Sequence, residues 1–324
     1  MLAREVIQRV REIQVRTGRQ VADVLAGQYV SVFKGRGIEF DEVRPYVPGD
    51  EVRTIDWKVT ARLGHPYVKR FVEERQLTLM LMADVSASQD FGSTTRTKRE
   101  TTAELCALLA FSASLNDDKV GLTLFHGEIE QYIPPRKGQK HALRVVREVL
   151  THESKQANQT EPHARPKRRL TRWLPVGSRR KWWRRGRQAT DIAGAMEFLL
   201  SVTKRKTVCF VVSDFFDDGY IRAMQMAGRK HDVIAVLVTD PRELELPNVG
   251  MLELLDPETG ATVTCDTSSA AFRRSFAAHA AARIEQLERR FRRAKLDFIH
   301  IDSSGSIVDP LARFFRMRER RRRR

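Results

Sequence analysis

Residues 78–92 read TLMLMADVSASQDFG, and this stretch indicates both the fold and the position of a site. Its apolar run ends at Asp84, and Ser86 and Ser88 follow at alternate positions. An unbroken apolar run of this length, bounded by small polar residues, is typical of a parallel strand that is buried on both faces. Open α/β folds bind their ligands beyond the carboxyl ends of such strands. Two hydroxyls and a carboxylate at that position offer the oxygen ligands that a hard divalent cation prefers.

The chain from Leu77 onward alternates apolar runs with helical patterns. We expect strands at 77–83, 120–125, 207–213, 233–238 and 298–302, and helices at 97–115, 190–202, 219–229 and 270–294. Strands that alternate with helices predict an α/β fold with a doubly wound, mainly parallel sheet. Near the end, MLELLDPETGATVTC (251–265) predicts a hairpin that turns at PETG.

The first 76 residues form a different kind of region. Residues 2–16 carry apolar side chains at helical spacing, which predicts an amphipathic helix. Residues 27–75 are rich in glycine, proline and alternating charge, which predicts short strands and turns. We therefore divide the chain as follows: an N-terminal region (1–76), an α/β domain (77–302) with a polar-then-basic insert (151–188), and a C-terminal segment (303–324) with an arginine-rich tail.

The composition is that of a globular protein, with 41% apolar and 31% charged residues among 324. Its apolar runs fall short of the roughly 20 residues needed to cross a bilayer. The charged N-terminus does not resemble a signal peptide, so we expect a cytoplasmic location. Three cysteines far apart in the sequence fit neither a disulfide framework nor a zinc site, and we expect them to be small core residues: Cys106, Cys209 and Cys265.

The net charge of +17 is concentrated in two segments. Residues 164–187 hold eleven Lys or Arg and no acid, and residues 313–324 hold eight Arg and one Glu. The rest of the chain is therefore close to neutral. The first segment also contains three tryptophans, a composition that suits an anionic membrane surface or single-stranded nucleic acid, and equally a solvated linker. We expect the arginine-rich tail to be disordered and to have salt-sensitive affinity for polyanions.

Two further oxygen donors follow or precede other predicted elements. Asp214 follows the strand 207–213, and Thr190 precedes the next predicted helix, where it is a candidate N-cap. Because the carboxyl ends of parallel strands share one edge of a sheet, five side chains are expected to meet there: Asp84, Ser86, Ser88, Thr190 and Asp214. They predict a site for Mg²⁺ or another divalent cation. The alternative to a metal site is an ordinary turn, in which such side chains form hydrogen bonds to the backbone of their own loop.

These five residues resemble the metal-ion-dependent adhesion site of von Willebrand factor A domains. The run GRGIEFDEVRPYVPGDEVRTIDWKVTAR (35–62) and the later SDFFDDG (213–219) resemble a bacterial domain-of-unknown-function family, number fifty-eight, whose core is von Willebrand A-like. The resemblance covers nearly the whole chain. One departure is Gln89-Asp90, which adds an acid beside the predicted site.

The resemblance implies a non-enzymatic protein-interaction module. In such a module the two aspartates act on the cation largely through water, so one coordination position can accept a carboxylate from a partner protein. The resemblance also implies association with a MoxR-type AAA+ ATPase or its client, as an adaptor or maturation factor. The location implied is cytoplasmic, including the inner surface of the membrane.

The family motif within 35–62 allows two interpretations. Its residues are Arg44, Gly49, Asp50, Arg53, Asp56, Trp57 and Arg62. One interpretation is a partner-docking surface. The other, which we favour, is structural: Trp57 is buried at the junction with the sheet, and ion pairs of the charged residues surround it.

Two alternative functions remain open from the sequence. The first is a Mg²⁺-dependent phosphohydrolase with Asp84 as nucleophile and the metal held by Asp214, Asp217 and Asp218. Against it, Ser86 stands where that class normally carries an acid. The second is an adaptor that binds nucleic acid or an anionic membrane through 164–187 and 313–324.

Overall fold

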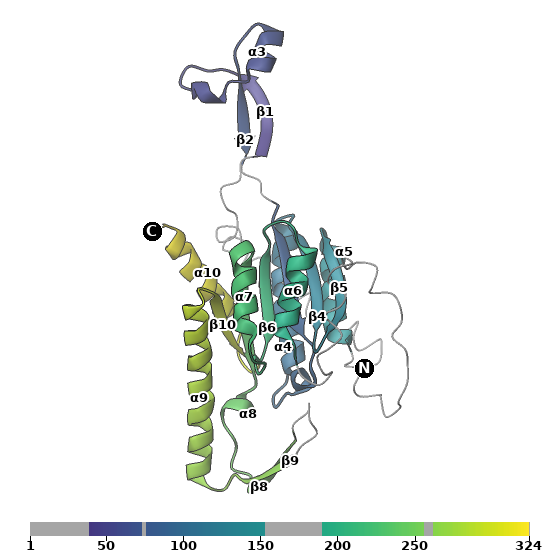
Figure 1. The fold of residues 1–324 in the computed structure, drawn as a ribbon, viewed down its shortest axis with the longest axis vertical. Helices are drawn as coiled ribbons and strands as arrows, with labels where there is room; N and C mark the ends of the chain where they lie inside the picture. The colour runs from purple at the N-terminus through teal and green to yellow at the C-terminus, as the bar shows by residue number, and fades with distance from the viewer. Residues whose placement is uncertain (1–38, 73–75, 153–189, 256–261, 324) are drawn as a thin grey trace.

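A computed structural model of the protein describes residues 39–72, 76–152, 190–255 and 262–323. The predicted N-terminal helix lies outside these residues, and so does nearly all of the basic insert. The described chain forms a six-stranded sheet with helices on both faces and two small two-stranded sheets (Figure 1).

The six-stranded sheet has the strand order β10-β7-β6-β3-β4-β5. Its strands are β3 (Thr78–Asp84), β4 (Lys119–Phe125), β5 (Ile129–Arg136), β6 (Val208–Ser213), β7 (Asp232–Thr239) and β10 (Asp297–Asp302). Neighbouring strands are parallel, except that β5 runs antiparallel to β4 at the edge. The doubly wound α/β fold and all five predicted strands are confirmed. The strand β5 was not predicted, and its two prolines are tolerated because it is an edge strand.

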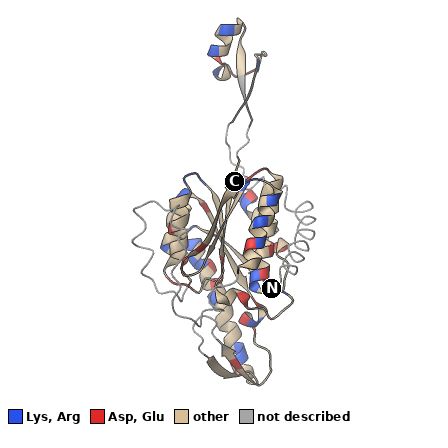
Figure 2. Cartoon of the chain, turned by 90° about the vertical axis from the view of Figure 1, so that its right-hand side faces the viewer, with Lys and Arg blue, Asp and Glu red and all other residues tan. Residues whose placement is uncertain are grey.

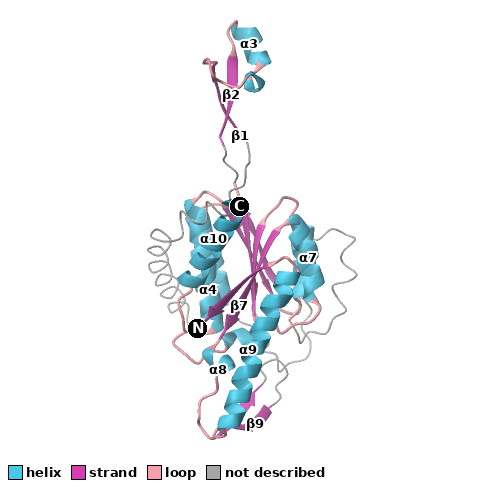
Figure 3. Cartoon of the chain, turned by 90° about the vertical axis from the view of Figure 1, so that its left-hand side faces the viewer, coloured by secondary structure: helices cyan, strands magenta, loops and turns pink. Residues whose placement is uncertain are grey.

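Helices cover both faces of this sheet (Figure 3). They are α4 (Lys98–Leu115), α5 (Gln139–Thr151), α6 (Ile192–Val202), α7 (Tyr220–Lys230), α8 (Pro241–Leu244), α9 (Ala270–Arg293) and α10 (Val308–Arg323). The central strand β3 shows why its sequence is apolar throughout. Leu79 and Leu81 belong to the core under α4, α5 and α10, whereas Met80 and Met82 belong to the core under α6, α7 and α9. Side chains alternate along a strand, so a central strand covered on both faces needs an unbroken apolar run.

The predicted disorder of the terminal RERRRRR (318–324) was wrong for residues 318–323, because they continue the helix α10. Leu311 and Phe315, four residues apart on α10, are buried in the core. Arg318 makes two hydrogen bonds to Asp232, of 2.6 and 2.9 Å, and lies 2.7 Å from Asp297. The apolar face of α10 and these ion pairs on β7 and β10 order a segment that its charge alone would leave solvated.

A small module precedes the sheet. Strands β1 (Glu39–Pro45) and β2 (Tyr67–Val72) pair antiparallel, and the short helices η2 (Val52–Thr54) and α3 (Trp57–Leu63) lie between them in sequence. Figure 1 draws this module apart from the six-stranded sheet. The described part of 27–75 thus confirms the predicted short strands and turns.

Trp57 does not plug a junction, so the favoured structural interpretation of the motif was wrong. The residue is 67% exposed, and Arg53 and Arg62 are exposed as well. Asp56 is the N-cap of α3, where its side chain accepts hydrogen bonds from the backbone N–H groups of Lys58 (2.9 Å) and Val59 (3.3 Å). Asp56 therefore begins the helix α3, whose first residue, Trp57, is exposed.

The turn of the motif is held by a different ion pair. Arg44 lies 2.6 Å from Oδ1 of Asp50, and Oδ2 of Asp50 accepts a hydrogen bond from the backbone of Val47 (3.0 Å). Gly49 has a φ of 108°, a conformation that favours glycine. The PGD turn is therefore a local structure closed by its own aspartate.

The predicted hairpin is confirmed as β8 (Met251–Leu255) and β9 (Thr262–Asp266), while the turn itself lies outside the described residues. Cys106 and Cys209 are buried in the core, as expected, but the prediction was wrong for Cys265, which is only partly buried on β9 and belongs to neither core cluster. Basic and acidic positions are interspersed along the described helices (Figure 2). Within the described ranges, no helix has the length and apolarity needed to traverse a bilayer.

Candidate metal centre

The predicted site lies where the connections of the sheet diverge. Strands β3 and β6 are neighbours, but the chain leaves β3 for α4 on one face and leaves β6 for α7 on the other. Such a divergence opens a crevice at the carboxyl edge of a parallel sheet. Ser86 and Ser88 follow β3 through the short helix η3 (Ala87–Asp90), and Asp214 follows β6. The strand order therefore brings these three side chains together.

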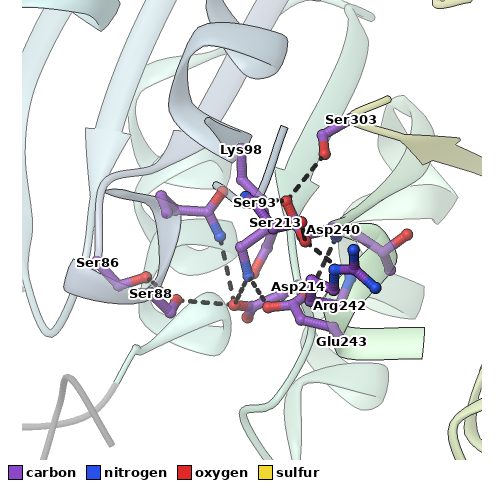
Figure 4. Close-up of polar contacts among 12 residues, drawn as sticks. Ser86, Ser88, Ser93, Lys98, Ser213, Asp214, Asp240, Arg242, Glu243 and Ser303 are labelled. Atoms are coloured by element: carbon purple, nitrogen blue, oxygen red, sulfur yellow. Dashed lines mark hydrogen bonds and ion pairs between the residues drawn. The ribbon is translucent and has the colours of Figure 1, made fainter. Parts of the chain in front are cut away.

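The two serine hydroxyls form the centre of the site (Figure 4). Their oxygens are 2.9 Å apart, and the hydroxyl of Ser88 donates a 2.7 Å hydrogen bond to Oδ2 of Asp214. Because that bond uses the Ser88 proton, the Ser86 hydroxyl is the donor within the pair. Octahedral Mg²⁺, with oxygens at about 2.0–2.1 Å, separates adjacent ligands by about 2.9 Å, whereas six-coordinate Ca²⁺ needs about 3.3 Å or more. The spacing of the serine pair fits Mg²⁺.

Asp84 orients the loop after β3. Its Oδ1 accepts a hydrogen bond from the backbone of Ser86 (2.9 Å), and its Oδ2 accepts one from the hydroxyl of Ser213 (2.7 Å). Burial, and secondarily the nearby carboxylate of Asp214, raises the pKa of Asp84 to about 7. Each oxygen of Asp84 thus has a hydrogen-bond partner within the chain, and the carboxyl group joins the loop after β3 to the end of β6.

Asp214 makes its side-chain contacts through Oδ2, and its partners include a lysine that was not predicted from the sequence. Besides the Ser88 hydroxyl, its Oδ2 lies 3.2 Å from Nζ of Lys98 and 3.4 Å from Nε2 of Gln89. Lys98 is completely buried, and its Nζ also lies 2.6 Å from Oε1 of Glu243 on α8. Burial lowers the pKa of Lys98, but Asp214 and Glu243 together outweigh burial, so the pKa is raised and the ammonium stays charged.

No local pattern could have found this lysine. Lys98 opens α4 directly after the N-cap Thr97, and a lysine at a helix start is ordinarily solvated. Glu243 lies 145 residues away, in a four-residue helix. The one hint in the sequence is that Lys98 follows the Asp-x-Ser-x-Ser run (84–88) by ten residues, so its side chain can contact the loop after β3.

The fifth predicted residue, Thr190, contacts a histidine. Its hydroxyl lies 3.4 Å from Nδ1 of His126, which follows β4, and in the described part of the chain it bonds there and not to the serine pair. The backbone N–H of Asp191 donates to the carbonyl of His126 (2.8 Å). Asp191, not Thr190, caps α6, because its side chain accepts from the backbone of Gly194 (2.8 Å). The structure therefore joins four of the five predicted residues directly.

The loop that carries Asp214 is strained and anchored. Phe215 has a φ of 55° although it is a bulky residue, and it is buried. Arg283 of α9 donates a 2.6 Å hydrogen bond to the carbonyl of Asp214, and its guanidinium lies 3.7 Å from the centre of the Phe216 ring. Strained backbone persists where the surroundings hold it, and it is concentrated at functional loops.

The other acids near the site face elsewhere. Asp217, which the phosphohydrolase alternative places on the metal, accepts a 3.0 Å hydrogen bond from the backbone of Ile192. Asp90 lies 2.7 Å from Arg99. The described residues contain no group of three His, Cys, Asp or Glu side chains that could hold a metal. A cation at this edge would therefore depend on the serine hydroxyls, which suits a hard ion such as Mg²⁺.

Comparison with known proteins identifies relatives along most of the chain. The family model described as "Protein of unknown function DUF58" matches residues 42–286. The uncharacterized protein Rv1480 of Mycobacterium tuberculosis is 29% identical over 312 residues, which cover 96% of this chain and 89% of that protein. The uncharacterized protein MAV169 of Mycobacterium avium is 30% identical over 131 residues, which cover 40% of this chain and 77% of that protein.

Solved structures give weaker similarity. The conserved hypothetical protein BatB from Bacteroides thetaiotaomicron matches with a TM-score of 0.44 and 15% identity, covering 75% of this chain and 99% of that one. An aerotolerance-related membrane protein from Bacteroides fragilis matches with a TM-score of 0.45 and 13% identity, covering 76% and 99%. Similarity at this level supports no statement about function. The family match, in contrast, spans most of the sequence, and the chain belongs to the DUF58 family of proteins of unknown function.

Proposed function

We propose that this protein is a cation-dependent protein-interaction module that captures an acidic side chain of a partner, and that it is not an enzyme. The observation that carries the proposal is the pair of serine hydroxyls 2.9 Å apart, held by Asp214 at the divergence of the sheet. When bound there, Mg²⁺ or another divalent cation would supply an electrophilic coordination position for a partner's carboxylate.

The residues of the site have different proposed roles. The hydroxyls of Ser86 and Ser88 are the proposed direct ligands, because neutral oxygens bind a cation without cancelling its charge. Asp214 fixes the direction of the Ser88 proton and so leaves an oxygen lone pair of Ser88 towards the site. Asp84 holds the backbone of Ser86. We keep Thr190 outside the direct ligand set, since its hydroxyl contacts His126 and, among the described residues, has no hydrogen bond to either serine.

Two observations favour binding over catalysis. Both oxygens of Asp84 accept hydrogen bonds from within the chain, which counts against a nucleophilic attack by this carboxylate on phosphorus. Asp217 faces the start of α6, so it does not complete a carboxylate cluster around Asp84. These contacts therefore favour the phosphohydrolase alternative less than the sequence alone does.

The partner we propose is a MoxR-type AAA+ ATPase or its client, with this protein as an adaptor or maturation factor in the cytoplasm or at the inner membrane surface. The support is the family resemblance. The exposure of Trp57 adds to it, because Trp57, Val52 and Leu63 are all exposed large apolar side chains of the small module, and exposed tryptophan is enriched at protein interfaces. The small module therefore offers a second contact surface in addition to the serine pair.

Affinity capture with the full-length protein tests this function. The chain is used as bait in Mg²⁺ and in EDTA, and proteins eluted by EDTA are identified by mass spectrometry. The test variant is Ser88→Ala, which removes one proposed ligand. The control is Ser268→Ala, because Ser268 is exposed and its backbone donates a 2.9 Å hydrogen bond to Asp266, as that of Ser86 does to Asp84.

We expect EDTA and Ser88→Ala to release the same partner and Ser268→Ala to retain it. Capture that withstands both EDTA and Ser88→Ala would overturn the proposed function. An EDTA eluate without an AAA+ ATPase, or a protein that such an ATPase remodels, would overturn only the assignment of the partner.

A further inference from the structure

Lys98 occupies an unusual position in this protein. Its side chain is completely buried at the first residue of α4, and its ammonium lies between two carboxylates: Asp214 at 3.2 Å and Glu243 at 2.6 Å (Figure 4). A buried lysine normally requires a partner, but here it has one acid that belongs to the serine site and one that does not. The ammonium is therefore shared between the site and α8.

The same carboxylate oxygen links the lysine to the serines. Oδ2 of Asp214 accepts a hydrogen bond from the hydroxyl of Ser88 and contacts Nζ of Lys98. A cation held by the serine hydroxyls would then lie near a fixed positive charge that solvent cannot screen. Repulsion between buried charges is much stronger than between solvated ones, because the effective dielectric constant is lower. The charge of Lys98 opposes the binding of any divalent cation at the serine pair.

Glu243 acts on the lysine from the other side. Its Oε1 contacts Nζ of Lys98, and its Oε2 accepts a 3.0 Å hydrogen bond from the backbone of Asp240 in the capping box of α8. Asp240 in turn accepts hydrogen bonds from Ser93 and Ser303, so Glu243 is held in place. Its negative charge offsets the lysine and makes the neighbourhood of the serine pair more favourable to a cation.

We propose that Lys98 and Glu243 are opposing determinants of cation affinity at the serine pair: Lys98 keeps the affinity low, and Glu243 restores part of it. This inference rests on the proposed cation site. Its consequence is that the protein alone binds the cation weakly, and that a partner's carboxylate, which adds the missing negative charge, binds together with the cation. Because Glu243 belongs to α8, cation affinity is coupled to the position of that helix.

Two charge-removing variants test the proposal in opposite directions. Lys98→Met keeps the length of the side chain and removes its charge. Glu243→Gln removes the negative charge and retains a side chain that can complete a capping box. The control is Lys137→Met, since Lys137 also pairs with a carboxylate, at 2.5 Å from Asp117, but at the opposite edge of the sheet. Binding of Mg²⁺ and Mn²⁺ to each full-length variant is measured by calorimetry.

A second readout separates a charge effect from damage to the fold. Thermal unfolding of each variant is followed in EDTA and again in Mg²⁺, because a ligand that binds only the folded state raises the midpoint. We expect Lys98→Met to bind the cation about tenfold or more tightly than the wild type and Glu243→Gln to bind it about tenfold more weakly. The Lys137→Met protein should match the wild type.

Each outcome decides between the two proposals. If the wild type binds the cation and neither variant changes its affinity, the roles of Lys98 and Glu243 are overturned and the proposed function stands. The same holds if both variants shift the affinity in one direction. Binding by Lys98→Met but not by the wild type supports the role of Lys98, and partner capture by the wild type in Mg²⁺ and in EDTA then decides the proposed function. No binding by any variant overturns both. If Lys98→Met does not fold, Glu243→Gln decides alone: weaker binding supports the proposal and unchanged binding overturns it.

Discussion

The hydroxyl of Ser88 donates a 2.7 Å hydrogen bond to a carboxylate 126 residues away, that of Asp214. This bond is what separates the site from an ordinary turn. Asp84 and Ser86 share a 2.9 Å backbone bond, but so do Asp266 and Ser268 in an exposed turn after β9. The backbone hydrogen bond from a serine to the aspartate two residues before it therefore occurs in both turns. Of these two turns, only the one after β3 also has a carboxylate from the end of β6, that of Asp214.

The pH dependence of stability should reveal the buried Asp84. Its pKa is about 7 in the folded protein against an ordinary value of 3.8, so the folded protein binds this proton more tightly than the unfolded chain does. Its contribution to the free energy of unfolding is therefore complete below about pH 4 and is lost as the pH rises through about 7. A tenfold change in proton affinity corresponds to about 1.4 kcal/mol, so the loss amounts to a few kcal/mol.

Denaturant unfolding in EDTA across this pH range checks the prediction, with Asp84→Asn as the comparison. The Oδ1 of an asparagine can accept from the Ser86 backbone, and its Nδ2 can donate to the Ser213 hydroxyl, so both contacts can persist without a charge. The variant should therefore lack the decline and be more stable than the wild type at neutral pH. Parallel pH curves for the two proteins would contradict it. Mg²⁺ should reduce the decline in the wild type alone, because a cation favours the ionised carboxyl group.

The adjacent residues Phe215 and Phe216 should differ sharply when each is changed to alanine. Phe215 is buried with its ring centre 5.1 Å from that of Phe291, whereas Phe216 is 64% exposed and contacts Arg283. We expect Phe215→Ala to lower the free energy of unfolding by about 3–5 kcal/mol and Phe216→Ala by about 1 kcal/mol or less. Chemical denaturation measures both, and equal losses would contradict the described packing.

Trp57→Ala should leave the stability of the protein nearly unchanged. An exposed residue outside a core contributes within about 0.5 kcal/mol, although a buried tryptophan would cost several times more. The same variant should weaken partner capture if the small module is a docking surface. A large loss of stability would instead restore the structural interpretation of the motif, and denaturation together with capture distinguishes the two.

Deletion of residues 164–187 should remove most salt-dependent binding to polyanions, because this segment holds eleven Lys or Arg and no acid. Binding to single-stranded oligonucleotides and to anionic vesicles is measured over a range of salt concentrations. Partner capture in Mg²⁺ should survive the deletion, since the serine pair follows β3. Unchanged binding to both polyanions would dismiss the alternative in which the protein is a nucleic-acid or membrane adaptor.

The sequence by itself determined the elements whose signals are local. The apolar run before Asp84 identified the central strand, because every side chain of a strand that is covered on both faces is buried. The alternation of strands and helices identified the doubly wound sheet, and the PETG turn identified the hairpin of β8 and β9. The serine pair was also found, since both hydroxyls follow one strand.

Only the tertiary structure decided which distant side chains meet. The order of the strands places Asp214 beside Ser88 and leaves Thr190 with His126. The path of the chain after β7 brings Glu243 onto Lys98, which the sequence shows as an ordinary first residue of a helix. Periodicity reports burial and backbone pairing within a few residues, whereas an ion pair across 145 residues depends on the whole topology. That is the physical reason why the site could be located from the sequence but its charge balance could not.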